Sequence, residues 1–174
     1  DEDLSRGLGD VYKRQLYWDG CRSCAQANQL AMDAEYSVAE VSWETHHESL
    51  MELRFEIFIG EQGIAAEEEL DPNDPHCRHF IALNNEGLVL GCGRLTPEGQ
   101  IGRMAVRATL RQSGIGSAIL KHILECARRN GRKDLFLHAQ KDAQQFYTKH
   151  GFTIDGETFI EAGIPHIGMQ YQLA

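Results

Sequence analysis

Residues 101–116 read Ile-Gly-Arg-Met-Ala-Val-Arg-Ala-Thr-Leu-Arg-Gln-Ser-Gly-Ile-Gly, and this stretch decides the fold. Its apolar first part, Ile101 to Val106, predicts a strand, and its two glycines predict a tight turn. The amphipathic run that follows predicts a helix ending at Gly131. A strand, a glycine turn and a helix start in this order form a cradle for an anion. Backbone N–H groups point outward from a helix N-terminus, and the helix dipole favours negative charge there.

The residues of the turn suit a phosphate group. Gly114 and Gly116 lack a Cβ atom, so a bulky anion can approach the main chain closely. Arg111 adds a fixed positive charge with forked donors. Ser117 either donates its hydroxyl to a phosphate or satisfies an N–H group of the first helical turn. The pattern is neither a P-loop, which needs Lys-Ser/Thr after the glycines, nor a dinucleotide fingerprint, which needs a third glycine and a later acidic residue.

A second segment, residues 134–153, predicts a short strand over 135–139 and a short helix over 141–150 that stops at a glycine. The spacing Arg-x-x-Gly-x-Gly resembles the acetyl-CoA pyrophosphate motif of the GNAT superfamily of N-acetyltransferases. The second segment resembles the other diagnostic segment of that superfamily, at the expected distance downstream, in Ala143-x-x-Phe146-Tyr147-x-x-x-Gly151-Phe152.

The resemblance narrows to the ElaA-like branch and covers roughly residues 36–173. Two more segments carry it, namely Leu53-Arg54-Phe55-x-Ile57-Phe58-x-x-Glu61-Gln62-Gly63 and Gly163-Ile164-Pro165-His166-Ile167-x-Met169. It implies an α/β fold with a single GNAT domain, in which a mixed central sheet is flanked by helices.

The rest of the chain predicts the other elements of this sheet. Strands are expected at residues 36–41, 79–83, 89–95, 152–160 and 166–173, with a hairpin turn at 84–87 and a second turn at 97–99. A capping box, Thr45-x-x-Glu48, predicts a helix start, and helical spacing of apolar residues carries that helix into Gly60. An acidic loop follows over 60–78. Its run Glu67–Glu69 is expected to be a solvated face, or else an electrostatic collar for a cationic substrate.

Composition restricts the class of protein. The chain has 174 residues, of which 42% are hydrophobic and 25% charged, as in one soluble globular domain. A net charge of −9 argues against nonspecific nucleic-acid binding, which needs a positive surface. No apolar run is long enough to span a membrane. Five scattered cysteines and the absence of a secretion signal fit reduced thiols in a cytoplasmic protein.

Residues 1–31 are expected to be a non-native or disordered leader, with the GNAT domain occupying 32–174. The segment Ser5 to Gln15 resembles translated sequencing-adapter sequence, and Met32 directly precedes the first predicted strand. Cys21-x-x-Cys24 lies in this leader. It is not interpreted as a zinc or redox site, because no second ligand pair follows at zinc spacing.

The resemblance also implies the chemistry. An amine attacks the thioester of acetyl-CoA directly, and no metal takes part. Backbone N–H groups of Met104, Ala105 and Val106 polarise the thioester carbonyl. The pyrophosphate is held by the turn, which comprises Arg111, Gln112, Ser113, Gly114, Ile115, Gly116 and Ser117. Tyr147 protonates the departing thiolate; alternatively, its ring only anchors the short helix.

The base that takes the ammonium proton is left open by the sequence. Glu61 follows the first helix, where the substrate cleft is expected, and His79 and His166 have side chains that titrate near neutrality. We rank them in that order, with a water chain and no dedicated base as a further option.

Four other residues bear on the cofactor contacts. Arg103 and Arg107 flank the motif strand, and one of them could hold phosphates, although Arg107 is expected to be solvated. The sequence departs from the family pattern at Gln140 and Lys141, where many members carry asparagine, and this puts a cofactor contact there in doubt.

The expected function is therefore transfer of an acetyl group from acetyl-CoA to an amine. A non-catalytic acyl-CoA binding or sensing module is the alternative, in which Tyr147 serves only for packing. A structural partner-binding domain would require both motifs to be coincidental. Neither the acceptor amine nor the oligomeric state follows from the sequence, and a homodimer is left open.

Overall fold

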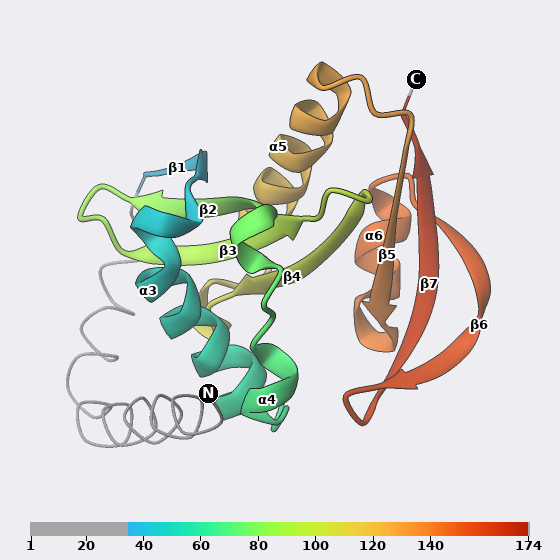
Figure 1. Ribbon diagram of the computed structural model, residues 1–174, viewed down its shortest axis with the longest axis horizontal. Helices are drawn as coiled ribbons and strands as arrows, with labels where there is room; N and C mark the ends of the chain where they lie inside the picture. The colour runs from blue at the N-terminus through green and yellow to red at the C-terminus, as the bar shows by residue number, and fades with distance from the viewer. Residues whose placement is uncertain (1–34, 174) are drawn as a thin grey trace. The chain divides into compact units, whose positions relative to one another are not determined.

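The computed structural model describes residues 35–173, which form one sheet of seven strands in the order β1-β2-β3-β4-β5-β7-β6 (Figure 1). The strands are β1 (Tyr36–Val41), β2 (Arg78–Asn84), β3 (Val89–Leu95), β4 (Gln100–Val106), β5 (Asp134–Gln140), β6 (Thr153–Glu161) and β7 (Ile164–Gln172). The helices are α3 (Trp43–Arg54), α4 (Ala66–Glu69), α5 (Ile115–Arg129) and α6 (Gln144–Lys149), with a π-helix, η1 (Phe55–Glu61), directly after α3. The mixed α/β fold is confirmed. The expected leader, with Cys21, Cys24 and Met32, lies outside the described residues.

The sheet divides into two halves between β4 and β5. These two strands run parallel and pair only at Gln100 with Phe136 and at Ile101 with Leu137. Beyond that point β4 pairs with β3, and β5 pairs with β7. The chain leaves β4 for the glycine turn and α5, and it leaves β5 for α6. Both helices therefore begin where the strands separate, the position at which α/β sheets bind ligands.

Helices α3 and α5 cover opposite faces of the first half. Cys92 of β3 packs in a cluster with Leu50 and Leu53 of α3. The neighbouring Gly93 faces α5, because a Cβ atom there would lie 2.9 Å from the side chain of Ile123. Successive residues of β3 thus pack against different helices, because the side chains of a strand point alternately to opposite faces of the sheet.

The first helix begins earlier than predicted. It begins at Trp43, after Ser42, and the Thr45 hydroxyl donates to the Ser42 carbonyl (3.3 Å). The predicted capping box is therefore wrong. The helix reaches Gly60 as predicted, but its last part, η1, has the wider π turn and ends at Glu61. Single π-turns inside helices are frequent at functional sites.

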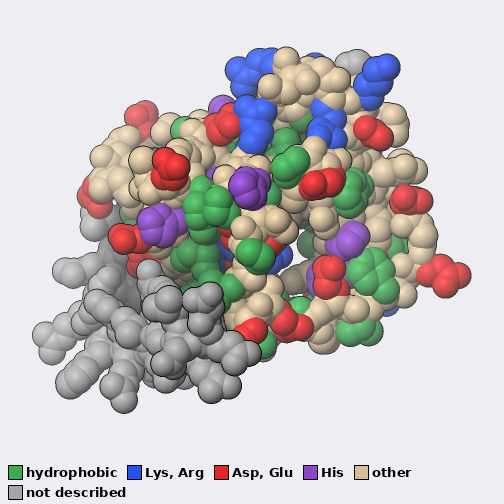
Figure 2. Space-filling view, in the orientation of Figure 1, with side chains coloured by type: hydrophobic (Ala, Val, Ile, Leu, Met, Phe, Trp, Pro, Cys, Tyr) green, Lys and Arg blue, Asp and Glu red, His purple; other side chains and the backbone are tan. Residues whose placement is uncertain are grey.

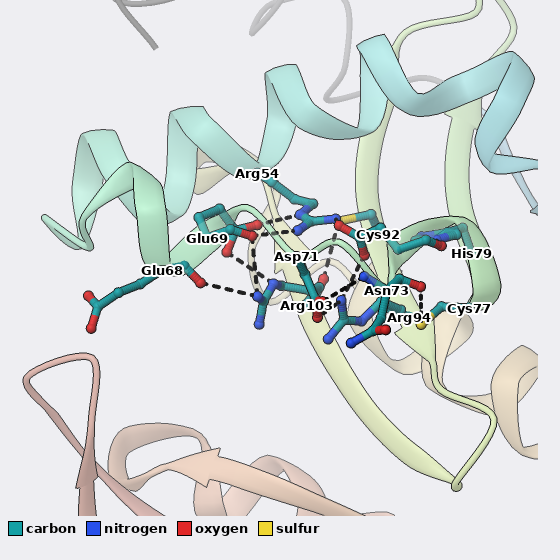
Figure 3. Close-up of polar contacts among 11 residues, drawn as sticks. Arg54, Glu68, Glu69, Asp71, Asn73, Cys77, His79, Cys92, Arg94 and Arg103 are labelled. Carbon is teal, nitrogen blue, oxygen red and sulfur yellow. Dashed lines mark hydrogen bonds and ion pairs between the residues drawn. The ribbon is translucent and has the colours of Figure 1, made fainter. Parts of the chain in front are cut away.

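A buried charge network fills the space between α3, α4, β3 and β4 (Figure 3). Arg54 pairs with Glu69 and, at 2.9 Å, with Asp74. Arg94 lies 2.7 Å from Asp74 and 2.7 Å from Asp71. Burial raises the pKa of Glu69 despite its neighbouring arginines. The prediction of a solvated face is wrong for Glu69, which is almost fully buried.

Candidate active site

The N-terminus of α5 offers free donors beside open space. Gly114, the residue before the helix, has φ +92°, a left-handed conformation that glycine adopts without strain. A Cβ atom at Gly114 would meet no atom within 4 Å. The N-cap residue, Gly114, has no side chain to cap this 15-residue helix. The Ala118 N–H group donates to the Gly114 carbonyl, which leaves the N–H groups of residues 115–117 without an intrahelical acceptor. This geometry fits an anionic group.

Arg111 bends back across the end of β4. Its Nε donates to the Val106 carbonyl at 3.1 Å, and its Nη2 donates to Glu61 Oε2 at 2.6 Å. The sequence assigned these two residues to different tasks, and the structure pairs them. Their side chains are 45% and 33% exposed, so the pair contributes little to stability and can be exchanged for another anion at small cost.

The two arginines that flank the motif strand are both engaged elsewhere. Arg107 donates to the Val89 carbonyl at 2.8 Å and pairs with Glu56, so the prediction of a solvated Arg107 is wrong. Arg103 lies 3.0 Å from Glu69 in the buried network. Neither geometry suits a phosphate ligand.

A β-bulge precedes the segment Met104 to Val106. Val106 lies opposite Gly91, but Gly102 lies opposite Arg94, so β4 carries one residue more than β3 between these pairs. Arg103, inside the bulge, has φ +51°. Bulges commonly re-aim a strand beside an active site. The assignment of these backbone N–H groups to a thioester carbonyl stays a prediction.

Tyr147 combines a buried ring with a free hydroxyl group. The ring packs edge-on against Phe146 and Phe152, with centroids 5.0 and 5.8 Å away. Its hydroxyl has no hydrogen-bond partner within residues 35–173. The residue as a whole is 8% exposed. Burial raises the pKa of Tyr147 above its ordinary value of 10, so the phenol is protonated at neutral pH.

Tyr147 lies close to the glycine turn through its neighbour Phe146. A Cβ atom at Gly116 would lie 3.6 Å from the Phe146 ring and 3.7 Å from Val106. The end of β4, the start of α5 and helix α6 therefore meet at one place. The Ser117 hydroxyl, on the first turn of α5, makes no hydrogen bond to the described residues and is free for a ligand. Ile115 is buried and offers only its backbone.

His79, the second-ranked base, lies in the interior. Its Nε2 atom is 2.8 Å from the Asp74 carbonyl, and its ring packs on Trp43. Burial lowers the pKa of His79. This surrounding is that of a structural histidine, and we do not retain His79 as a base.

Gln140 connects the two halves of the sheet. It is the last residue of β5, and its Nε2 donates to Oε1 of Gln62, the residue after η1, at 2.8 Å. Figure 2 shows a hollow in the surface between the two halves. The departure from the family pattern at Gln140 thus has a physical role, because the amide pair spans the place where β4 and β5 separate.

His166, the third candidate base, belongs to a group that the sequence did not reveal. It lies opposite Gln140 in the β5–β7 ladder. Glu161 of β6 approaches it, with Oε2 3.9 Å from the histidine Nε2, and reaches His138 of β5 at 3.1 Å. The alternation of β5, with Phe136, His138 and Gln140 between buried residues, was the available signal. Which residues of β6 and β7 lie beside His138 and Gln140 depends on the order of the strands in the sheet, and local sequence patterns do not predict that order.

Three other properties describe this part of the chain. Within residues 35–173 no group of three or more His, Cys, Asp or Glu side chains is arranged to hold a metal ion. None of the described helices is both long and apolar enough to cross a membrane. The described cysteines are free thiols, and burial raises the pKa of Cys92 to about 12, which makes that thiol unreactive.

Comparisons with known proteins agree with this geometry. The family model for the acetyltransferase (GNAT) domain matches residues 47–173. The chain is 36% identical to an uncharacterized N-acetyltransferase, YjcF, of Bacillus subtilis (strain 168), over 67% of this chain and 86% of the relative. It is 31% identical to protein ElaA of Escherichia coli (strain K12), over 74% and 95%. The crystal structure of an acyl-CoA N-acyltransferase from Pseudomonas aeruginosa is similar, with TM-score 0.68, 28% identity and coverage of 79% and 99%.

Proposed function

This chain belongs to the acetyltransferase (GNAT) domain family, in its ElaA-like branch, and is an acyltransferase; from this premise we propose that it moves an acetyl group from acetyl-CoA to an amine by direct attack. The observation that carries the proposal is that the free donors at the start of α5, Arg111 at the end of β4, and helix α6 with Tyr147 meet beside the place where β4 and β5 separate. The pyrophosphate of acyl-CoA would bind the helix donors and Arg111, and its thioester would lie near Tyr147.

Each residue has a task in this reaction. The N–H groups of residues 115–117 and Arg111 bind the pyrophosphate, and the Ser117 hydroxyl adds a donor. The amine nitrogen attacks the thioester carbonyl carbon, and the C–S bond breaks with its electron pair on sulfur. Tyr147 donates its proton to that sulfur as negative charge develops. Its raised pKa keeps the donor protonated, although it also makes the phenol a weaker acid.

The proposal is tested by incubating the purified protein with acetyl-CoA and a panel of amines while free thiol is measured. Thiol release that depends on an amine supports the transferase. Calorimetric binding of acetyl-CoA without turnover for any amine would support the sensing module instead. Failure to bind acetyl-CoA at all would contradict both.

Gly114→Glu is expected to weaken acetyl-CoA binding at least tenfold, about 1.4 kcal/mol, because a carboxylate would stand in the pyrophosphate cradle. Calorimetry measures the affinity. Gly114→Asn is the matched control, since asparagine tolerates φ > 0 and adds no charge; it should lose only a few-fold. Equal losses in the two variants would mean that strain, not the anion site, is responsible.

Glu61→Gln is expected to tighten acetyl-CoA binding by about 1.5- to 5-fold, because it removes the carboxylate that competes for Arg111 in a pair worth about 0.2–1 kcal/mol. Turnover should stay within a few-fold of wild type, since the ion pair makes Glu61 an unsuitable base. Arg111→Gln serves as the control: in that background the second substitution should change nothing. Unchanged affinity in the single variant would contradict the exchange of anions at Arg111.

A further inference from the structure

We infer that His166 takes the proton from the acceptor ammonium and that Glu161 positions and stabilises it, an inference that rests on the proposed transfer reaction. The two residues lie on the face of the β5-β7-β6 half that also carries His138 and Gln140, where Glu161 is exposed and His166 is buried. In Figure 2 histidine, acidic and hydrophobic side chains lie together over this part of the molecule.

The backbone fixes the tautomer of His166. Its Nδ1 atom lies 2.8 Å from the Ile164 carbonyl oxygen, which can only accept a hydrogen bond. Nδ1 therefore carries the hydrogen in the neutral ring, and Nε2 carries the free lone pair. No side chain in the described part of the chain hydrogen-bonds to Nε2. The residue as a whole is buried, with 7% of its surface exposed. A base needs such a free lone pair to take a proton.

Glu161 lies where it favours the protonated ring. Its Oε2 is 3.9 Å from His166 Nε2, too far to occupy the lone pair but close enough to attract the imidazolium. Its Oε1 is held by His138 Nδ1 at 3.1 Å, and the Phe159 ring packs between the two histidines, 5.0 and 6.1 Å from them. The titratable groups that face His166 are thus His138 from β5 and Glu161 from β6, while its ladder partner Gln140 is neutral.

His166 also lies at the end of the sheet where the reaction is proposed to occur. Residues opposite each other in an antiparallel ladder point to the same face, so His166 and Gln140 share a face. Gln140 contacts Gln62, the neighbour of Glu61. Tyr147 of α6 packs on Phe152, which packs on Tyr171. Tyr171 lies opposite Leu135, so α6 covers the face of β5 on which Ala139 is buried. His166 and Tyr147 therefore lie on opposite faces of the β5–β7 pair, in the half of the molecule that separates from β4.

The proton transfers balance. The ammonium gives one proton to His166 Nε2, and the free amine attacks the carbonyl carbon. When the C–S bond breaks, the sulfur takes the electron pair and the Tyr147 proton. The second proton of the attacking nitrogen restores the phenol. His166 releases its proton to solvent, so the net products are the amide, free CoA thiol and one proton.

The decisive measurement is the pH dependence of kcat/KM with an accepted amine. His166→Gln is expected to lower kcat/KM about a hundredfold at neutral pH and to remove the acidic limb that this histidine creates, while acetyl-CoA affinity stays within twofold. Added imidazole should restore part of the rate. His138→Gln is the matched control and should keep the limb. A limb that survives in His166→Gln would overturn the inference.

Glu161→Gln gives a second test that does not depend on changing a buried residue, because this side chain is 50% exposed. Loss of the negative charge disfavours the imidazolium, so the midpoint of the acidic limb should move to lower pH. An unmoved midpoint would contradict the role of Glu161. Wild-type protein that neither binds acetyl-CoA nor turns over an amine would instead contradict the proposed function, so the two failures are distinct.

Discussion

Tyr147→Phe is expected to lower turnover by about 10²–10⁴-fold, the usual effect of losing a positioned proton donor. The substitution keeps the ring that packs between Phe146 and Phe152 and deletes only the oxygen. Acetyl-CoA affinity should change little, because the hydroxyl acts when the thiolate develops. Steady-state turnover with an accepted amine, beside calorimetric affinity, measures both quantities.

Tyr171→Phe is the matched control, because this tyrosine of β7 packs on the same Phe152 ring at 5.0 Å. Its turnover should remain within twofold of wild type. Full turnover in Tyr147→Phe would remove Tyr147 as the acid and leave it as an anchor. A fall in melting temperature together with weaker binding would also favour the anchor. Because burial raises the pKa of Tyr147 above 10, we expect activity to be lost through ionisation of this phenol only above pH 10.

The elements around the glycine turn were predictable because their signals are local. An apolar strand, a residue that must adopt φ > 0 and an amphipathic run lie within thirty residues of one another, and each signal reports on its own neighbourhood. The structure agrees with these three local predictions: it has strand β4, a left-handed Gly114 and helix α5 in this order. The same holds for the hairpin turn after Asn84, where its side chain accepts from the N–H groups of Glu86 and Leu88.

The buried charges were not predictable from such signals. Arg54, Glu69 and Asp74 come from separate segments, and charged residues are assigned to the surface unless a partner is known. Their partners are set by the tertiary fold, which brings α3, α4 and β3 together. The continuation of the first helix to about Gly60 was predicted, but the π-type turn of η1 was not, because apolar spacing does not report the width of a helical turn.

In the candidate site, too, features within one segment were predictable and contacts between distant segments were not. The anion cradle could be predicted because it lies in one segment. The pairing of Glu61 with Arg111 joins residues fifty positions apart. The contact of Glu161 with two histidines depends on the strand order β5-β7-β6, in which the last strand along the chain lies between two earlier ones. The sequence analysis proposed Glu61, Arg111 and His166 as separate candidates. Only the geometry shows which residues lie close enough to act together.

Asp74→Asn is expected to lower the free energy of unfolding by about 3–5 kcal/mol, the cost of removing one partner from a buried ion pair. The Asp74 carboxylate accepts from Arg54 at 2.9 Å and from Arg94 at 2.7 Å, and all three side chains are buried. Asparagine keeps the shape but leaves two arginines without their shared negative charge. Urea unfolding followed by circular dichroism measures the difference.

Glu40→Gln is the control, because Glu40 and Arg78 form an ion pair at 2.7 Å whose side chains are 37% and 38% exposed. Water solvates both groups when the pair is broken, so this variant should lose at most about 1 kcal/mol. The comparison isolates burial, since each substitution removes one carboxylate charge paired with arginine. Similar small losses in both variants would contradict the network's role in stability and would mean that water reaches Arg54 and Arg94 once Asp74 is neutral.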